Sequence, residues 1–514
     1  MWRLYCVALV IIGLVYPAAG GALEARADVP LGAPMLLEQE EDRALLEEGR
    51  THLFSMRLEA ATDVFDALAE RPDGAVAAAY HHALQALLQS VITDDDQYIA
   101  AFDERYEALR EALNAVPESR WRTYLAAEAR LMRTLMLAKQ NRVVRAAFAA
   151  RGAYSRYQDA ASGTASFAEP YKGLGIFHLA IGSLPSGYQR VLSILGFSGS
   201  IEQGIRELEQ ARDGAYATVE ATAYLGLIDV VIRYRTAEAV ARFEALREAY
   251  PESPLMAYLL AYALLEDRQG GAALEVAQHA VRQGQQPRYF FVDYAEYYLA
   301  QALFRHNRFQ PAATYYRRYL ARHEGPGLRA PANLYAGLAL ELTERRAEAV
   351  VFYRRVQDDR DFDADQAAYR EAQRRLDAEI SFADRLLVRA TNAFYAGQYH
   401  LSRVLLAQVG SAETATPPIR ARARYYLGRV AYAQGQWPAA EQHFQRTLEA
   451  PGRRTDGLAP WSHFYLGQMR QAEGAADAAE AHYTEALNFA TPFDYHQWLE
   501  QRVAAARETL TGGA

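Results

Sequence analysis

Apolar side chains recur along almost the whole chain at the three- and four-residue spacing of amphipathic helices. Alternation of apolar and polar positions, which would indicate half-buried strands, does not extend over a useful length. The strand candidate Leu227–Ile232 lies inside a longer helical period. The pattern therefore predicts an all-α fold.

Two neighbouring segments near the C-terminus follow one template. Each has a glycine, a second glycine seven residues later, an alanine at twelve and an aromatic residue at sixteen: Gly428, Gly435, Ala440 and Phe444, then Gly467, Gly474, Ala479 and Tyr483. We interpret the first glycine and the alanine as facing contact points of two closely packed antiparallel helices. The second glycine ends the first helix, because a positive φ costs little only at Gly or Asn. The aromatic residue fills the space toward the next unit.

The template recurs with lower fidelity elsewhere in the chain. Its members are Gly49, Ala61, Phe65, Leu68 and Pro72; Gly226, Ala239 and Phe243, with one extra residue; Ala261, Ala273 and Ala277; Ala300, Asn307, Phe309, Ala312 and Tyr316; Gly337, Ala349 and Tyr353; and the turn from Asn392 to Tyr399, with Gly397. A weaker unit begins near Ala83. A single helical pair cannot bury its own apolar face, so we expect stacking of these units to build the core.

This template resembles the tetratricopeptide repeat, a helix-turn-helix unit of about 34 residues. The resemblance covers roughly residues 40–110 and 215–490. It implies a right-handed superhelix, an α-solenoid, whose concave surface is lined by the first helix of each pair, helix A. It also implies a protein-binding role.

The chain departs from the template between residues 171 and 213. A helix that begins near Tyr171 must be interrupted by Pro185, and a new helix is expected to open at Ser200 or Ile201. An apolar helix, a Ser-Leu-Pro turn, a Leu-Gly-Phe turn and a following helix resemble a segment of the inclusion-body-clearance family of repeat proteins.

The surroundings of that segment carry two further expectations. The stretch Ser155–Ser166 is rich in Ser, Ala and Gly and is expected to be a hinge or loop. The apolar stretch Leu174–Ile181 is too short to span a membrane and contains His178, so we expect it in the buried core rather than at a membrane.

The N-terminus has the pattern of an export signal. Arg3 supplies a positive charge, Leu4–Tyr16 is apolar and uncharged, and Pro17 ends this stretch. Ala25–Ala27 fits the small-x-small rule for cleavage before Asp28. The pattern predicts a periplasmic or secreted protein.

Two alternatives concern the same segment. Cleavage at Gly20–Ala22 is a second candidate, and an uncleaved anchor in the inner membrane would use residues 4–16. The predicted organisation is then a signal peptide (1–27), N-terminal helical repeats (28–154), a loop with a non-repeat helical segment (155–215) and a C-terminal repeat array (216–510).

The composition of the chain excludes or disfavours several classes of function. The formal charge of -8 disfavours a strongly basic nucleic-acid binder, and a mean hydropathy of -0.22 excludes a polytopic membrane protein. The only cysteine, Cys6, lies in the segment expected to be removed, so the mature chain has no thiol for a disulfide, a zinc site or a nucleophile.

The sequence gives only weak evidence for a metal site or a catalytic site. Asp359, Asp361, Asp363 and Asp365 alternate as in a calcium loop, but Ala364 replaces the required glycine and Arg370 the closing glutamate. We interpret these aspartates, and Asp94–Asp96, as helix starts. His443 and His482 occupy equivalent places in adjacent units, too far apart to share one zinc ion, and His81 and His82 point in different directions. We predict no enzyme, no cofactor and no metal.

The best functional lead is an aromatic stripe. On the repeat template, the concave positions of helix A hold Tyr258, Tyr262, Tyr294, Tyr297, Arg422, Tyr425, Arg429, Tyr432, Trp461 and Phe464. Tyr and Trp dominate binding hot spots, although many of these rings could equally fill gaps between repeats. The carboxylate clamp of chaperone-binding repeats needs Lys and Asn here, and the chain lacks them.

These observations predict a non-enzymatic scaffold or adaptor of the bacterial envelope that binds an extended or helical segment of another protein. The alternatives are an anchored assembly factor for a secretion or polysaccharide system, and a hydrolase with an unrecognised site. We expect a protein partner, with peripheral envelope association as an option, and neither nucleic acid nor a small-molecule substrate.

Overall fold

The computed structural model describes residues 29–93, 96–163, 165–184, 189–190, 192–193, 197–290, 293–323, 325, 327–357, 363–449, 457–489 and 493–511. Throughout these ranges the regular elements are helices, and no strand occurs. The prediction of an all-α fold is confirmed. None of the helices in these ranges combines the length and the apolar character that a membrane span requires. The predicted signal segment, residues 1–27, lies outside them.

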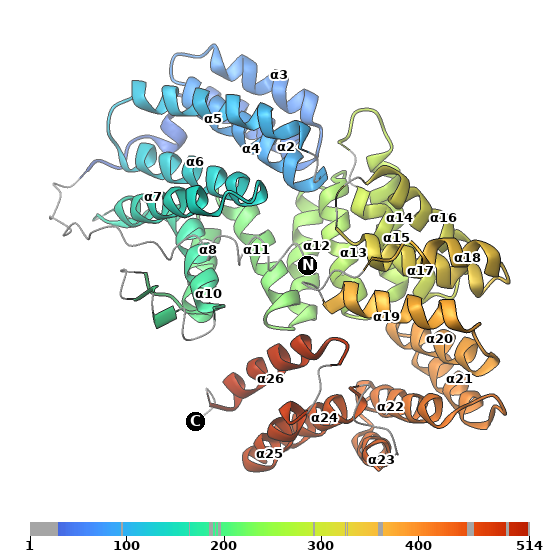
Figure 1. Cartoon of the computed structure of the whole chain (residues 1–514). Helices are drawn as coiled ribbons and strands as arrows, with labels where there is room; N and C mark the ends of the chain where they lie inside the picture. The colour runs from blue at the N-terminus through green and yellow to red at the C-terminus, as the bar shows by residue number, and fades with distance from the viewer. Residues whose placement is uncertain are drawn as a thin grey trace. The chain divides into compact units, whose positions relative to one another are not determined.

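The chain forms two compact units. The first takes in residues up to 228, together with 241–257 and 282–292. Its helices, shown in Figure 1, are η2 (Pro34–Leu36), α2 (Glu40–Phe54), α3 (Leu58–Ala69), α4 (Ala75–Thr93), α5 (Gln97–Ala115), α6 (Arg120–Lys139), α7 (Val143–Ala161), α8 (Pro170–Gly182) and α10 (Ile201–Arg212). Helices α2 and α3, α4 and α5, α6 and α7, and α8 and α10 pack as pairs.

Four helices contribute residues to both units: α11 (Thr218–Val231), α12 (Thr236–Ala249), α13 (Pro254–Glu266) and α14 (Gly270–Gly284). The second unit takes in residues 229–240, 258–281 and 293–514. Its other helices are α15 (Asp293–Arg305), α16 (Phe309–Arg322), α17 (Arg329–Glu341), α18 (Arg346–Tyr353), α19 (Asp363–Asp377), α20 (Phe382–Tyr395), α21 (Tyr399–Ser411), α22 (Pro417–Ala433), α23 (Trp437–Leu448), α24 (Leu458–Ala472), α25 (Ala476–Leu487) and α26 (His496–Thr511). Helix α19 packs on α17 and α18, and α26 packs on α24 and α25.

Left-handed residues close the turns of the helical pairs. Positive φ values occur at Gly397 (74°), Gly435 (69°), Gly474 (77°) and Asn307 (58°), and also at Met56 (61°), Arg268 (63°) and Glu344 (64°). The predicted role of the second glycine is confirmed. The last three of these residues are not glycine or asparagine, so the left-handed conformation costs each of them about 1–2 kcal/mol.

Glycine and an aromatic ring set the spacing within the pairs. A methyl group built on Gly428 would lie 2.7 Å from the ring of Phe444, and the same kind of close contact occurs for Gly49 with Phe65, Gly226 with Phe243, Gly337 with Tyr353, and Gly467 with Tyr483. In the equivalent pair, the Ala479 carbonyl oxygen also lies 3.3 Å from a methyl group built on Gly467. The ring sixteen residues on is thus the nearest group to the glycine, and the close approach of Gly428 and Ala440 stays a prediction. Phe444 also stacks on Tyr465 of the next unit, with ring centroids 5.4 Å apart, as predicted.

Sequence analysis recognised no repeat template in one pair, α6 with α7, although the predicted N-terminal helical repeats (28–154) include most of it. Asn141 closes its turn with φ 57°, and Thr134 occupies the place that glycine holds in the template. Ala146 and Ala150, twelve and sixteen residues after Thr134, are buried. Without glycine and an aromatic residue, this pair lost the two signals that identify the others.

The segment from 171 to 213 forms two closely crossing helices. Helix α8 ends at Gly182, and α10 opens after Ser200, whose hydroxyl accepts a hydrogen bond from the Gln203 amide at 3.1 Å. A methyl group on Gly175 would lie 2.8 Å from the carbonyl oxygen of Gly204. The expected helix start is confirmed. The expected burial of Leu174–Ile181 is also confirmed, since only Ile176 in this stretch is half-buried.

Other local expectations have mixed outcomes. The loop expected over Ser155–Ser166 is wrong up to Ala161, because α7 continues through this stretch and buries Tyr157 on its inner side. Helix α19 begins at Asp363 and α5 begins directly after Asp96, as the helix-start interpretation requires. Asp94, Asp95, Asp359 and Asp361 lie outside the described residues.

Candidate partner-binding face

The ten sequence-predicted residues all belong to the second unit, and we use the name A-helix face for this set of residues. Tyr262, Tyr297, Tyr425 and Phe464 are buried, so their rings act as packing residues in this structure. The other six are half-buried: Tyr258, Tyr294, Arg422, Arg429, Tyr432 and Trp461. Only these six offer side-chain surface to a partner.

Additional aromatic residues join the predicted ones. The Tyr298 ring centroid lies 5.4 Å from those of both Tyr258 and Tyr262. Tyr465 lies 5.1 Å from Tyr432 and 6.3 Å from Trp461 in the same measure. Sequence reasoning missed Tyr298 and Tyr465 because it kept one face of each helix, although each of them directly follows another aromatic residue in the chain.

Arg429 is surrounded by aromatic rings. Its guanidinium carbon lies 4.5 Å from the Phe394 centroid, and between 5.3 and 5.8 Å from four tyrosine centroids: Tyr395, Tyr425, Tyr426 and Tyr465. Nη1 donates to the Tyr395 hydroxyl at 2.9 Å. Each close cation–π contact contributes about 0.5–2 kcal/mol, which offsets the lost hydration of the charge.

The pKa of Tyr395 indicates that its surroundings carry an excess of positive charge. Burial alone would raise the pKa of its phenol, but the Arg429 charge, hydrogen bonds with Tyr426 and Arg429, and the Arg305 charge outweigh burial. The pKa of Tyr395 therefore lies below its ordinary value. A half-buried phenol with a lowered pKa indicates a local excess of positive charge.

The C-terminal helix covers part of the A-helix face. The guanidinium carbon of Arg502 in α26 lies 4.4 Å from the Tyr234 centroid and 5.9 Å from the Trp461 centroid. The Tyr234 hydroxyl also donates to Gln501 at 3.2 Å. Trp461 is thus partly covered by the chain itself, whereas Tyr432 makes its hydrogen bond, at 3.2 Å, to Gln468 of the neighbouring helix α24.

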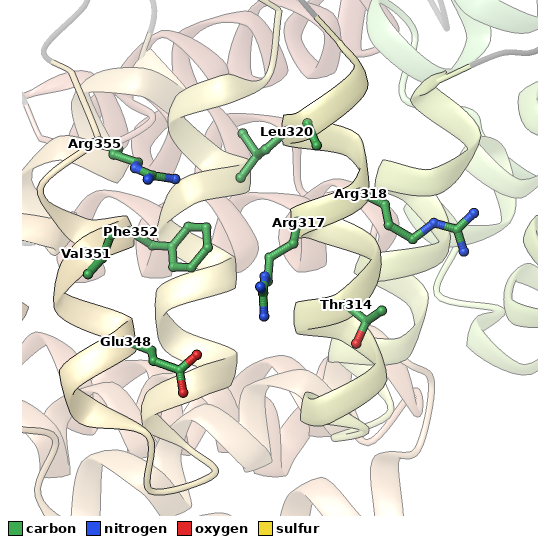
Figure 2. A pocket seen from close by; sticks show the side chains of 9 residues that line it. Thr314, Arg317, Arg318, Leu320, Glu348, Val351, Phe352 and Arg355 are labelled. Atoms are coloured by element: carbon green, nitrogen blue, oxygen red, sulfur yellow. The ribbon is translucent and has the colours of Figure 1, made fainter.

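A hollow of about 730 Å³ lies between α16 and α18 (Figure 2). It is lined by Thr314, Arg317, Arg318, Leu320, Ala321, Glu348, Val351, Phe352 and Arg355. Figure 2 shows Arg317 and Phe352 extending into the space between the two helices. Arg318 pairs with the buried Glu296 at 2.6 Å, and Glu348 pairs with Arg345 at 2.7 Å, so both of these charged groups are engaged in ion pairs.

The first unit contains a buried charge network. Lys172 Nζ donates to Glu128 at 2.7 Å and to Glu220 at 3.0 Å, while the hydroxyls of Tyr80 and Tyr157 donate to Glu128 at 3.1 and 2.6 Å. Burial would lower the pKa of Lys172, but the two carboxylates outweigh it and raise the pKa well above its ordinary value. The network joins α4, α6, α7, α8 and α11, and all of its members except the half-buried Glu220 are buried, which is typical of a structural network.

Histidines also form internal contacts. His178 links the Tyr154 hydroxyl, 2.9 Å from Nε2, to the Glu207 carboxylate, 2.5 Å from Nδ1. Tyr154 and His178 are buried, and Glu207 is half-buried. His463 and His482 approach within 3.2 Å, and the described part of the chain contains no group of three or more metal-ligating side chains.

Two family models match the chain. Residues 171–322 match Iml2/Tetratricopeptide repeat protein 39, and residues 387–457 match a tetratricopeptide repeat model. The first match confirms the resemblance of the segment from 171 to 213 and extends it to residue 322. No curated protein matches the chain.

Solved structures of repeat proteins resemble this chain, with low sequence identity and low TM-scores. A tetratricopeptide repeat protein from Parabacteroides merdae is 12% identical, with 56% of this chain and 99% of that chain covered and a TM-score of 0.24. The apo quorum sensor NprR from B. thuringiensis is 12% identical over 72% and 98%, with a TM-score of 0.33. The human IFIT1 dimer with m7Gppp-AAAA is 12% identical over 88% and 100%, with a TM-score of 0.29.

These structural likenesses carry no functional argument at such scores. The two family matches, together with the recurring left-handed turns and glycine–ring contacts, show that this chain contains tetratricopeptide repeats.

Proposed function

We propose that the chain is a non-enzymatic scaffold or adaptor of the bacterial envelope, which binds a segment of another protein on the A-helix face of its second unit. The observation that supports this most is the set of half-buried Tyr, Trp and Arg side chains on the A helices α13, α15, α22 and α24. Such side chains combine apolar contact with polar tips, as binding hot spots do. Tetratricopeptide repeats, which generally bind proteins, support the same function.

Covalent capture of partners in intact envelopes, followed by mass spectrometry, tests the proposal. Tyr432→Ala and Trp461→Ala should each weaken partner binding by roughly thirtyfold, the effect of losing a hot spot of about 2 kcal/mol. Trp437→Ala is the matched control, because this half-buried ring belongs to the first residue of α23, a B helix. Loss of binding in the control alone would refute the assignment of the face. Loss in all three with a lowered melting temperature would mean that these rings only pack.

Export from the cytoplasm is a separate part of the proposal and rests on residues 1–27. N-terminal sequencing of the mature protein should find a start between Gly20 and Asp28. An intact Met1 in the envelope fraction would favour the alternative, an inner-membrane assembly factor held by residues 4–16.

A further inference from the structure

Three half-buried arginines on or beside the A-helix face lack an acidic partner. Within the described residues, Arg268, Arg422 and Arg429 take part in no ion pair. The chain as a whole has 63 acidic against 55 basic side chains, so partners are not scarce. Arg346 of the same unit, for comparison, pairs with Glu341 at 2.8 Å.

Two of these arginines converge on one ring. The guanidinium carbons of Arg268 and Arg429 lie 5.4 and 4.5 Å from the centroid of the buried Phe394. The Nε atom of each is buried and has no hydrogen-bond partner. An incoming oxygen cannot reach these buried Nε atoms, but both residues are only half-buried, so part of each side chain is open to a carboxylate.

The surrounding charges do not neutralise this cluster. The guanidinium carbon of Arg305 lies 5.4 Å from the Tyr395 centroid. Glu266 pairs with Arg305, 3.7 Å away, and so leaves Arg268 and Arg429 without an acidic partner among the described residues. The lowered pKa of Tyr395 agrees with an excess of positive charge at this place.

We infer that Arg268, Arg422 and Arg429 form a subsite for acidic side chains of the protein segment that binds the A-helix face. The inference rests on the proposed function and adds the chemistry of the partner. Arg422 and Arg429 are two turns apart on α22, about 10 Å along the helix axis. Acidic residues about three positions apart in an extended segment span the same distance.

A peptide is favoured over a free anion by the surroundings of the arginines. Tyr426 and Tyr432 are half-buried next to Arg429 along α22 and offer apolar surface that an inorganic anion cannot use. The arginines supply charge-assisted hydrogen bonds, and the rings supply contact area for the peptide backbone and neighbouring side chains.

Calorimetric titration of the full chain tests the subsite with blocked hexaglutamate and, as its uncharged counterpart, hexaglutamine. Hexaglutamate should bind and hexaglutamine should not. Arg429→Gln and, separately, Arg268→Gln should each weaken hexaglutamate binding about tenfold, as expected for a lost charge-assisted hydrogen bond. Arg317→Gln, an exposed arginine of the hollow in Figure 2, is the matched control and should change the affinity less than about twofold.

A second readout follows the phenol of Tyr395 during a pH titration, as the difference in ultraviolet absorbance between the chain and its Tyr395→Phe variant, because the chain has 34 tyrosines. Bound hexaglutamate should raise the pKa of this phenol, and so should Arg429→Gln, because both reduce the local positive charge. If Arg429→Gln lowers the melting temperature, the hexaglutamate affinity of Arg268→Gln takes its place as the test.

Several results would overturn the inference. These are absence of hexaglutamate binding at millimolar concentration, equal weakening by Arg317→Gln, or displacement of the peptide by inorganic phosphate at the same concentration. If the arginine variants capture the natural partner like the wild type while Tyr432→Ala does not, the proposed function stands and the acidic subsite is refuted. If Tyr432→Ala, Trp461→Ala and the arginine variants all capture the natural partner as the wild type does, the proposed function and the acidic subsite are both refuted.

Discussion

Gly428 lies against the ring of Phe444, sixteen residues further along the chain, so closely that a methyl group on the glycine would fall 2.7 Å from Cε1 of the ring. The missing side chain lets helix B bring a whole ring up to the backbone of helix A. Phe444 is fully buried and also stacks on Tyr465 of the following unit. One glycine therefore controls both the packing within a pair and the contact to the next pair.

Gly428→Ala is expected to destabilise the protein by about 1–3 kcal/mol, because the methyl group overpacks the contact with Phe444. The effect opposes helix propensity, which favours Ala over Gly by about 1 kcal/mol. Chemical denaturation monitored by circular dichroism measures the difference in the free energy of unfolding.

The matched control for this change is Gly410→Ala. Gly410 lies in the last turn of α21, where an added methyl group would have no atom of another residue within 4 Å. Here the substitution should be neutral or stabilise by up to about 1 kcal/mol. Equal effects of the two substitutions would contradict the role assigned to the Gly428–Phe444 contact.

Glu344 provides a test of the turn that closes each pair. This exposed residue has φ 64° where other pairs carry Gly or Asn. Glu344→Gly should raise the free energy of unfolding by about 1 kcal/mol, because glycine adopts this conformation without steric cost. Ala347→Gly, at an exposed position inside α18, should lower it by a similar amount. A melting temperature lowered by both changes would rule out strain at Glu344.

The repeat pattern was predictable where its signals are local. Gly435 and Gly474 mark turns because only glycine accepts a left-handed conformation at no cost, and that preference is visible in the sequence. The partner of Gly428 was not predictable with certainty, since residues twelve and sixteen positions later both lie on the facing helix. The pair α6 and α7 escaped detection because Thr134 and Ala150 fill its contact with different side chains.

The candidate site was predictable only in part, for a physical reason. Helix periodicity places Tyr425, Arg429 and Tyr432 on one side of α22, but it does not tell how deeply each is covered by neighbouring helices. The structure buries Tyr425 and leaves Arg429 and Tyr432 half-buried. Contacts such as that of Arg268 with Phe394 join residues more than a hundred positions apart, and these depend on stacking of the whole unit.

The Lys172 network should be sensitive to loss of its one cation. Lys172→Met leaves Glu128 and Glu220 near each other without a counter-charge, which is expected to cost about 3–5 kcal/mol. Adding Glu128→Gln and Glu220→Gln to the same chain removes both uncompensated charges and should restore a large part of this loss. Urea denaturation of the two variants measures the difference. A single variant as stable as the wild type would mean that water reaches the network.

His81 is expected to make the first unit sensitive to acid. Its ring is fully buried, with its centroid 4.9 Å from that of Phe65, and Nδ1 lies 2.8 Å from the Ala77 carbonyl oxygen, to which it donates in the neutral form. Burial, and then the charge of Arg50, lower its pKa from 6.5 to about 3.

The sign of the effect follows from these two values. Between pH 6.5 and about 3 the unfolded state takes up a proton at His81 that the folded state does not, so the stabilisation is complete above pH 6.5 and is lost as the pH falls. The slope from this residue is at most about 1.4 kcal/mol per pH unit. His81→Gln keeps a polar side chain of similar reach but cannot titrate, so its free energy of unfolding should fall less steeply than that of the wild type between about pH 6.5 and 4. Because other groups titrate equally in both proteins, parallel curves would show that His81 is not held in its neutral form.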